Sequence, residues 1–403
     1  MDVTEKLGVL GSAARFEIAG ERQSTSVRPG PRAALCVGDT AQEAPGTLLR
    51  VLQSSYCEHD CAYCPLRRSN DPRRASFAPE ELAGAFADQW ARGRVSGLML
   101  SSATEGTADN SMARMLDTIQ ILRTRHQFDG YVHLKVLPGA SDAAIKHAAT
   151  LADRLSLNVE VPGPEYLEGL ETGKRWQQDI LRPLQQLREL NLAGEIRAGV
   201  TGQLLVGVAA PGSTAASDRA LADGSRWLRR EFDLRRVHFG TFTPAIGTPL
   251  AEALAPDPRR RARLYQWDWL GSHYQYADVE LDAAFDSAGN LPLALDPKLA
   301  VTMAHPGERP VEVNTASYQD LLRVPGIGPV SARRIVDLRH LGALRDLQDL
   351  RLLGVVTSRA APFVLLNGRR PPESGAALHR IRRALRAMGP KPVQLSLWPE
   401  LTS

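Results

Sequence analysis

Apolar and polar positions from residue 47 to about residue 250 follow two alternating patterns, which predict six strands separated by helices. Each strand is a short apolar run bounded by polar or turn-forming residues. The six runs are residues 48–54, 97–103, 131–137, 155–161, 203–209 and 236–242. Helical patterns between them include residues 79–92, 111–126 and 177–191. This order favours an α/β fold with a parallel sheet, whose strand C-termini carry the chemistry.

Three cysteines follow the first of these strands within eight residues. Cys57, Cys61 and Cys64 are spaced four and then three apart, and Tyr63 stands just before the last one. Iron–sulfur clusters are held by cysteine thiolates at close spacing, because one loop can wrap a corner of the cube. Three protein ligands on a four-iron cube leave one iron open to a small molecule. The motif therefore predicts a [4Fe–4S] cluster on these cysteines.

Two other roles for the cysteines compete with the cluster. A structural zinc site needs a fourth ligand, and His59 lies inside the loop, where its reach is awkward. A disulfide framework is disfavoured by only four cysteines in 403 residues and by the lack of a secretory context. The fourth cysteine, Cys36, stands alone and is more typical of a small buried side chain than of a ligand.

The cysteine spacing, the aromatic residue and the preceding strand together resemble the radical S-adenosylmethionine (radical SAM) superfamily. The resemblance implies a partial (β/α)6 barrel over residues 46–250. It also implies that the open iron chelates the amine and carboxylate of SAM. One electron then cleaves SAM to a 5′-deoxyadenosyl radical, which abstracts hydrogen from a substrate. The electron would come from a donor of the flavodoxin or ferredoxin type.

Polar residues at the strand ends are the expected SAM contacts. The second strand ends in serines, where the superfamily commonly binds the SAM amine through backbone groups. On the fourth strand two polar residues alternate with apolar neighbours, so both face one side of the sheet. The candidate cofactor-binding residues are Tyr63, Ser101, Ser102, Asn158, Glu160 and Gln203.

Two further polar motifs receive no role from the sequence. Glu105 follows the second strand but is displaced from the superfamily's glycine-glycine-glutamate pattern. Gly173-Lys174 is similar to a phosphate-binding loop, but the spacing is wrong and Arg175 replaces the required Ser or Thr. We therefore reject a phosphate loop.

Residues 251–310 are expected to form an accessory helix and a linker. The helical pattern covers residues 259–276, and a stretch punctuated by prolines follows it. Four aromatic residues on the helix are more typical of a core than of a stacking platform. They are Tyr265, Trp267, Trp269 and Tyr274.

Residues 311–368 resemble a tandem helix-hairpin-helix DNA-binding domain. The first copy, residues 321–336, reads LLRVPGIGPVSARRIV and follows a helix N-cap expected at Asn314 or Thr315. Glycines permit a tight turn whose amides point at a phosphate from the start of the second helix, and arginines add charge beside it. The candidate DNA-binding residues are Gly326, Ile327, Gly328, Arg333 and Arg334. A second, degenerate copy covers residues 347–360.

Charge is unevenly distributed along the chain, and the imbalance favours double-stranded DNA as the partner of this domain. Residues 323–391 contain 14 Lys or Arg and 4 Asp or Glu, a net charge of +10, whereas the rest of the chain sums to −6. A basic segment on a slightly acidic body is typical of nucleic-acid binding. Because hairpin contacts read phosphates, we expect little sequence specificity. A plain helical hairpin for protein contacts is the alternative.

The C-terminal segment is expected to hold a basic helix within residues 369–392 and a tail at 393–403. Gly389-Pro390 ends the helix. The tail resembles the short peptide by which bacterial repair and replication proteins dock on the sliding clamp. The residues that carry this resemblance are Gln394, Leu395, Leu397 and Trp398.

The chain begins without the basic start and long apolar core of a signal peptide, and no apolar run reaches membrane-spanning length. These patterns predict a cytoplasmic protein that does not enter a membrane. Residues 1–45 are expected to form an N-terminal extension. An apolar content of 43% and a charged content of 23% are typical of a soluble globular protein.

The cysteine motif followed by the hairpins resembles a family of predicted DNA modification or repair radical SAM proteins. The match also includes residues 133–135, 265–270 and 296–298. It implies an iron–sulfur, SAM-dependent enzyme that modifies or repairs DNA bases. One alternative is a radical SAM enzyme acting on RNA or a protein, with the hairpins as a tether. The other is a non-catalytic DNA-binding protein whose cluster is structural or redox-sensing.

Overall fold

A computed structural model shows the chain as two compact units. It describes residues 1–14, 35–37, 47–170, 172–304 and 310–372, together with residues 374, 375, 379 and 383. The first unit comprises Met1–Ala216 and Ala220–Asp257, and the second comprises Ser217–Arg219 and Pro258–Ser403. Most of the N-terminal extension and of the basic helix lies outside the described residues, as does the tail with Gln394, Leu395, Leu397 and Trp398.

The first unit is built on a seven-stranded sheet in which the strands lie in chain order. Strand β1 (Leu35–Val37) pairs antiparallel with β2, and the sequence pattern does not predict it. The other six strands run parallel, as predicted, and the fold is the expected half-barrel. They are β2 (Thr47–Leu52), β3 (Gly97–Ser101), β4 (Tyr131–Val136), β5 (Arg154–Glu160), β6 (Val200–Val206) and β7 (Arg236–Thr241).

Strand β6 lies three residues earlier than its predicted range, and glycines at both ends explain the difference. Gly199 has φ +78° and Gly207 has φ +83°, conformations that leave the extended region and favour glycine. A Cβ atom at Gly207 would lie 2.5 Å from the ring of Pro256, so this position also needs a residue without a side chain. The strand therefore ends at Val206.

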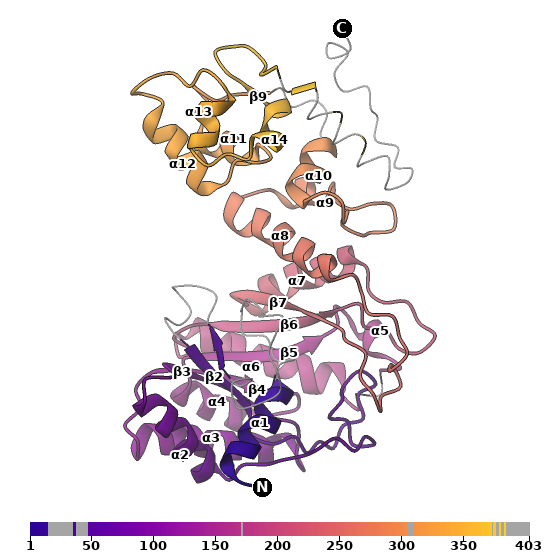
Figure 1. The fold of residues 1–403 in the computed structure, drawn as a ribbon. Coiled ribbons are helices and arrows are strands. Elements are labelled where there is room, and N and C mark those ends of the chain that lie inside the picture. Colours follow the sequence, from indigo (N-terminus) through magenta and orange to yellow (C-terminus); the bar gives the residue numbers. More distant parts are fainter. Residues whose placement is uncertain are drawn as a thin grey trace. The chain divides into compact units, whose positions relative to one another are not determined.

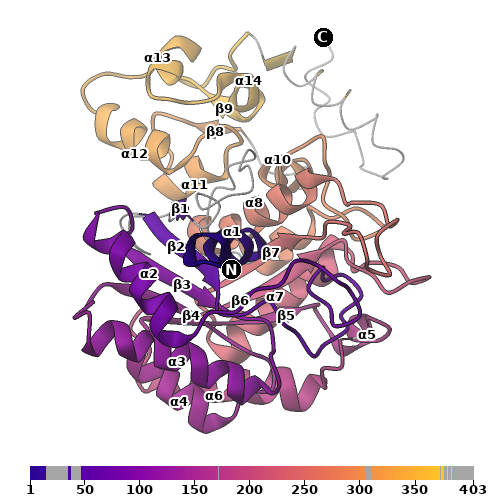
Figure 2. The same ribbon diagram turned by 60° about the horizontal axis from the view of Figure 1, so that its bottom comes forward.

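Helices connect the parallel strands, and four of them lie side by side along the sheet (Figure 1, Figure 2). These are α2 (Pro79–Ala91), α3 (Ala108–Thr124), α4 (Asp142–Leu151) and α6 (Arg182–Leu192). Helix α1 (Val3–Ala13) packs beside β2, whereas α5 (Pro164–Leu167) and α7 (Asp218–Phe232) follow β5 and β6. The predicted helix at 177–191 begins as a π-helical turn, Trp176–Leu181, because Pro183 lacks the amide that a regular helix needs there.

The two faces of the sheet differ in polarity. One face carries buried apolar residues from every parallel strand, including Leu49, Leu98, Leu134, Leu155, Leu204 and Phe239. The opposite face carries buried polar residues, including His133, Lys135, Ser156, Thr201, Gln203 and His238. Parallel strands are usually apolar on both faces. The polar face is therefore the one equipped for chemistry.

The second unit is helical, with one short parallel strand pair, β8 (Val311–Glu312) and β9 (Val364–Leu365). Its helices are α8 (Pro258–Tyr274), α9 (Asp278–Asp282), α10 (Pro297–Ala304), α11 (Tyr318–Arg323), α12 (Pro329–Leu338), α13 (Leu347–Leu352) and α14 (Thr357–Ala360). Leu295, Leu299 and Met303 share one hydrophobic core with the hairpin residues Leu321 and Ile335. Part of the expected linker therefore belongs to this unit. Within the described residues, every helix is too short or too polar to cross a membrane.

The helix that opens the first hairpin begins later than predicted. Ser317 is the N-cap of α11, and its hydroxyl accepts the amide of Asp320 at 3.0 Å. Asn314, the expected cap, instead binds the backbone of Leu344 through both ends of its amide, each at 2.9 Å. Asn314 therefore joins two loops, and the prediction of its capping role, like that of Thr315, is wrong.

Candidate active site and nucleic-acid interface

The cysteine loop begins directly after β2, at the edge of the sheet where the parallel strands end. Cys61 is buried, Cys57 and Cys64 are partly buried, and all three are free of disulfides. The side chain of Tyr63 hydrogen-bonds Cys61. The four residues that form the predicted motif are therefore together on one loop.

Backbone hydrogen bonds attach the loop to the segments that follow two other strands. The amide of Glu58 donates to the carbonyl of Thr104 after β3, and the amide of Ala62 donates to Leu170 beyond β5, each at 2.8 Å. The guanidinium of Arg74 donates to four further carbonyls at 2.5–3.1 Å, those of Ser55, Leu66, Arg67 and Asn70. The loop is therefore anchored by protein groups alone.

Asp60 braces the loop from within. It accepts the amide and the hydroxyl of Ser69, each at 2.8 Å, and Nε of Arg67 at 3.1 Å. The backbone hydrogen bond from Ser69, then its hydroxyl and then Arg67, lower the pKa of Asp60 to about 2. Asp60 therefore stays ionised at neutral pH and keeps these hydrogen bonds.

Two thiols of the loop, those of Cys61 and Cys64, are weaker acids than a free cysteine. Burial raises the pKa of Cys61, and it raises that of Cys64 to about 12, because a buried thiolate loses its hydration. The charge of Lys174 opposes this effect at Cys61. Metal ions bind thiolates and displace the protons. The loop is therefore suited to a group that takes several thiolates at once.

Glu160 and Lys174 lie beside the thiols, and only Glu160 was predicted there. Glu160 ends β5 at a register shift, with φ +71°, a conformation that residues other than glycine rarely adopt. Its carboxylate lies 4.0 Å from the ammonium of Lys174, and both side chains are over 90% buried. Burial lowers the pKa of Lys174, but the thiol of Cys61 and the carboxylate of Glu160 outweigh it, and the pKa is raised.

Lys174 is a site residue that the sequence analysis missed. Lys174 belongs to the Gly173-Lys174 pair that the sequence analysis rejected as a phosphate loop, and its ammonium interacts with the thiols of the cysteine loop. A Cβ atom at Gly173 would lie 3.6 Å from the His59 ring, which shows how closely the two loops approach. The sequence offered one indication that Lys174 is a site residue: it follows β5, at the same edge of the sheet as the cysteines.

The three thiols are the side chains of this loop that could hold the cluster predicted from their spacing, since iron–sulfur clusters bind cysteine thiolates. Over the described parts of the chain, no three His, Cys, Asp or Glu side chains are close enough to hold one ion. Cys57, Cys61 and Cys64 instead present three separate thiols on an anchored loop.

The other predicted SAM contacts lie on neighbouring strand ends. Ser101 ends β3, and its carbonyl accepts the amide of Gln53 at 2.8 Å beside the start of the cysteine loop. The hydroxyl of Ser102 donates to the carbonyl of Ala103 at 2.7 Å. Both serines are buried. Ser101 and Ser102 are therefore close to the loop in the sheet, with backbone groups at its polar edge.

A buried lysine joins the remaining two candidates. The ammonium of Lys135 on β4 hydrogen-bonds Oδ1 of Asn158 on β5 and lies 3.2 Å from Oε1 of Gln203 on β6. Two strand positions earlier, Nε2 of His133 lies 2.7 Å from the hydroxyl of Ser156. The polar face thus holds hydrogen-bonded pairs of side chains from different strands. These pairs depend on the register between the strands.

Glu105, which received no role, forms a network at the end of β3. Its carboxylate lies 2.5 Å from Nη1 of Arg114 and accepts the hydroxyl of Ser76 at 3.1 Å. Burial would raise the pKa of Glu105, but a hydrogen bond from Ser54 and the charge of Arg114 lower it. Glu105 is thus an ionised group that ties α3 to the segment after the cysteine loop.

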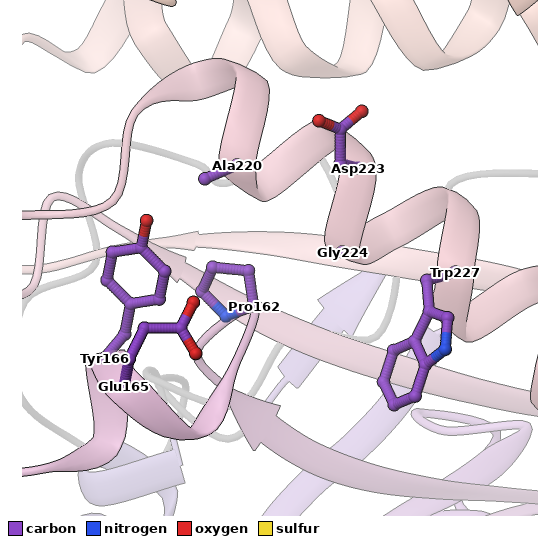
Figure 3. A pocket seen from close by; sticks show the side chains of 7 residues that line it. All are labelled: Pro162, Glu165, Tyr166, Ala220, Asp223, Gly224 and Trp227. Carbon is purple, nitrogen blue, oxygen red and sulfur yellow. The ribbon is translucent and has the colours of Figure 1, made fainter.

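A separate hollow of about 290 Å³ lies between α5 and α7 (Figure 3). Glu165 and Tyr166 stand on one side, and Asp223 and Trp227 project from α7 on the other (Figure 3). The carboxylates and the absence of a basic group among its lining residues make this hollow a poor match for phosphate. It is distinct from the cysteine loop.

The first hairpin has the tight turn that its glycines predict. Gly326 has φ +91°, and a Cβ atom there would lie 2.5 Å from the carbonyl oxygen of Val356. The amide of Val356 donates to the carbonyl of Gly326 at 2.9 Å. Gly354 marks the turn of the second copy with φ +86°. The two hairpins are therefore joined turn to turn, as a single unit.

Ile327, a predicted DNA-binding residue, supports this turn from inside the unit. Its side chain is 1% exposed, its amide donates to Val324 at 3.1 Å, and its carbonyl accepts Nζ of Lys298 at 2.6 Å. All of its groups are thus used inside the unit. Gly328 is the N-cap of α12, and Pro329 follows it as the first residue of the helix.

The basic residues of the region divide into internal and exposed groups. Arg339 donates to two backbone carbonyls at 2.6 and 3.2 Å, and Arg323 pairs with Glu280. Arg333 and Arg334 are exposed on α12, just after the hairpin turn. Arg333 and Arg334 remain predicted phosphate contacts, whereas Arg323 and Arg339 serve the fold.

We expect the stability of the helical unit to rise with pH because Lys298 is buried. Burial lowers the pKa of Lys298 to about 7, below the ordinary value near 10.5 that applies when the chain unfolds. Between these values the unfolded chain binds the additional proton, so unfolding becomes harder by on the order of 1 kcal/mol per pH unit. A neutral amine still donates to Ile327. Chemical denaturation from pH 7 to 10 measures the rise, which Lys298→Met should remove.

Comparisons with known proteins give one sequence match and several structural ones. Residues 307–358 match the helix-hairpin-helix motif family. No curated protein matches the sequence. Solved structures similar to the chain include methylornithine synthase PylB, with 17% identity, coverage of 53% of this chain and 58% of that chain, and a TM-score of 0.43. The FeFe-hydrogenase maturase HydG from Carboxydothermus hydrogenoformans has 17% identity, coverages of 53% and 48%, and a TM-score of 0.40.

A third structure is the radical S-adenosylmethionine methyltransferase TsrM from Kitasatospora setae, with cobalamin and a [4Fe–4S] cluster bound. It has 13% identity, coverages of 82% of this chain and 67% of that chain, and a TM-score of 0.39. The chain spans about half the length of the first two structures. Of these three structures, TsrM is described as a radical SAM enzyme, and residues 307–358 of this chain match the helix-hairpin-helix motif.

Proposed function

We propose that the chain is a radical SAM enzyme that modifies or repairs DNA bases. The observation that carries the proposal is the anchored loop with three free thiols at the polar edge of the half-barrel sheet. In this proposal Cys57, Cys61 and Cys64 hold a [4Fe–4S] cluster. When bound, the cluster supplies the electron that cleaves SAM and so generates a radical.

The chain's own residues would bind and orient SAM at this edge. Ser101, Ser102, Asn158, Glu160 and Gln203 remain the proposed contacts, with Tyr63 beside Cys61. Lys174 would offset the negative charge of three thiolates, because its ammonium already interacts with all three thiols. The Lys135 hydrogen bonds to Asn158 and Gln203 would fix the orientation of two of the contacts.

The second unit would hold the duplex through its phosphates. Gly328 and the first turn of α12 offer amides without helical acceptors, and exposed Arg333 and Arg334 add positive charge. Such contacts release counterions and so weaken with salt. Gly326 contributes by permitting the turn rather than by touching DNA.

Reduced, cluster-loaded protein is expected to convert SAM to 5′-deoxyadenosine and to alter a nucleoside of duplex DNA. Product analysis by mass spectrometry, with duplex DNA, RNA and no nucleic acid in parallel, measures both events. DNA-dependent change supports the proposal. SAM cleavage stimulated only by RNA would favour the tethered RNA or protein enzyme, and a loaded protein that never cleaves SAM would favour a non-catalytic iron–sulfur protein.

Two partners belong to the same proposal. A flavodoxin- or ferredoxin-like donor would supply the electron, which spectroscopic reduction of the cluster by such a protein would test. The tail would dock on the bacterial sliding clamp through Gln394, Leu395, Leu397 and Trp398. Titration of the peptide 391–403 against purified clamp tests this docking, and the absence of saturable binding would refute it.

A further inference from the structure

Helix α8 carries a row of cationic and aromatic residues at intervals of four. The row consists of Arg261, Tyr265, Trp269 and His273. Residues four apart are neighbours on one side of a helix, so these side chains form one continuous strip. The proposed function gives no role to this strip.

The opposite side of α8 supplies the core, which leaves the strip on the outer side. Leu264, Trp267 and Leu270 are buried, and the indole nitrogen of Trp267 donates to the carbonyl of Leu281 at 3.2 Å. Trp269 is 42% exposed, the opposite of the core position that the sequence pattern favours for these aromatic residues. An exposed indole offers a flat face on which a planar ligand can stack.

The rings of the strip are already stacked or paired with cations. The rings of Trp269 and His273 are parallel within 7°, with their centroids 3.6 Å apart. The guanidinium of Arg261 lies over the ring of Tyr265, 5.9 Å from its centroid. Because His273 covers one face of the indole, the other face is the one that a planar ligand would meet. Bases stack on aromatic faces in this way, whatever their sequence.

The strip lies next to the hairpin within the same unit. Helix α8 packs against α11, the first helix of the hairpin. Tyr274, adjacent to His273, has its hydroxyl 3.8 Å from the position of a Cβ atom on Gly328. Tyr274 packs against the core of this unit, so it places α8, rather than the strip itself, beside the turn that would hold a phosphate. The arginine of the strip gives it the charge that a nucleic-acid backbone requires.

We propose that Trp269 and His273, with Arg261 and Tyr265 beyond them, form a stacking site for unpaired bases of a DNA strand. The site deepens the proposed function, because it rests on DNA as the nucleic acid bound by this unit. Bases inside a duplex are stacked on one another and do not reach such a surface. The chain is therefore expected to favour DNA with a single-stranded segment beside a duplex.

Fluorescence anisotropy of the full chain with labelled DNA tests this site. The probes are an oligothymidylate of about 20 nucleotides, a paired duplex of equal length and the same duplex with an overhang. Trp269→Ala should weaken binding of the single strand and of the overhang DNA about tenfold, and that of the paired duplex less than about twofold. Trp269→Phe should retain most of the binding, since phenylalanine keeps a stacking face.

The matched control is Trp227→Ala, because Trp227 is 37% exposed and lies on α7 of the other unit. It should leave all three affinities unchanged. Arg333→Ala with Arg334→Ala should weaken the duplex and the single strand alike. Unchanged single-strand binding in Trp269→Ala, an equal loss on paired duplex, or tighter binding of a matched RNA strand than of DNA would overturn the proposal. Circular dichroism and thermal melting confirm that each variant is folded.

This experiment reads binding alone, so its failure differs from failure of the proposed function. Suppose that Trp269→Ala binds single-stranded and paired DNA as the native chain does, while DNA still stimulates SAM cleavage. This result overturns the stacking site only. Strand discrimination that depends on Trp269, in a protein that binds no iron and cleaves no SAM, supports the stacking site and overturns the enzyme.

Discussion

Cys61→Ala is expected to abolish iron binding and SAM cleavage together. Cys61 is the buried member of the three thiols, and its loss leaves two ligands for a cube that needs three from the loop. Anaerobic reconstitution of the variant should then give almost no iron, whereas the native chain should take up about four irons and show a charge-transfer absorbance. Iron analysis and the visible spectrum measure the change, and 5′-deoxyadenosine formation should fall to background.

The variant is expected to stay folded, because the loop is held by groups other than the thiols. Arg74 binds four carbonyls around the loop, and Asp60 holds Ser69 and Arg67. Thermal melting of the metal-free proteins should therefore agree within a few degrees. If the melting temperature of metal-free Cys61→Ala is far below that of the metal-free native chain, the loss of iron results from unfolding.

Cys36→Ala is the matched control, since Cys36 lies outside the motif. It should retain the iron of the native chain. Tight, stoichiometric zinc without iron uptake in the native chain would contradict the cluster. Retention of the full iron content in Cys61→Ala would contradict the ligand assignment.

The strands and the faces of the sheet were predictable because they depend on local periodicity. Six apolar runs became β2 to β7. The alternation was wrong for Glu160, because a register shift after Asn158 pairs these two residues with Gln203 and Leu204, which lie on opposite faces of the sheet. The partners of these residues were not predictable, because they come from distant segments. Lys135 reaches Gln203 across 68 residues of sequence. Lys174 reaches the thiols only because the loops after β2 and β5 share one edge.

In the helical unit the sequence predicted the hairpin motif correctly, but it did not predict the roles of several individual residues. The glycine turn was predictable because a hairpin needs glycine locally. Asn314 resembles an N-cap within its own segment, yet it binds Leu344, which lies 30 residues away. Net charge shows the same limit, since composition counts Arg323 and Arg339 among the DNA-binding charges and the fold uses both internally.

Gly326→Val is expected to disrupt the helical unit and with it DNA binding. The native φ of +91° is unfavourable for a β-branched residue, and its Cβ atom would lie 2.5 Å from the Val356 carbonyl oxygen. Val356 belongs to the second hairpin, and its amide donates to the carbonyl of Gly326. Neither turn can therefore move away without breaking the contact between the hairpins. We expect a loss of about 3 kcal/mol or more in the free energy of unfolding, or roughly 10 °C in melting temperature.

Gly342→Val is the matched control, because a Cβ atom at Gly342 meets no atom within 4 Å. It should change the stability by less than about 0.5 kcal/mol, as exposed substitutions usually do. Duplex binding by Gly326→Val should be at least about tenfold weaker, with a shallower dependence on salt, because phosphate contacts are lost. Iron content and DNA-independent SAM cleavage should persist, since the cysteine loop lies in the other unit. Equal melting and equal duplex affinity of the two variants would show that the turn does not require glycine and does not hold the duplex.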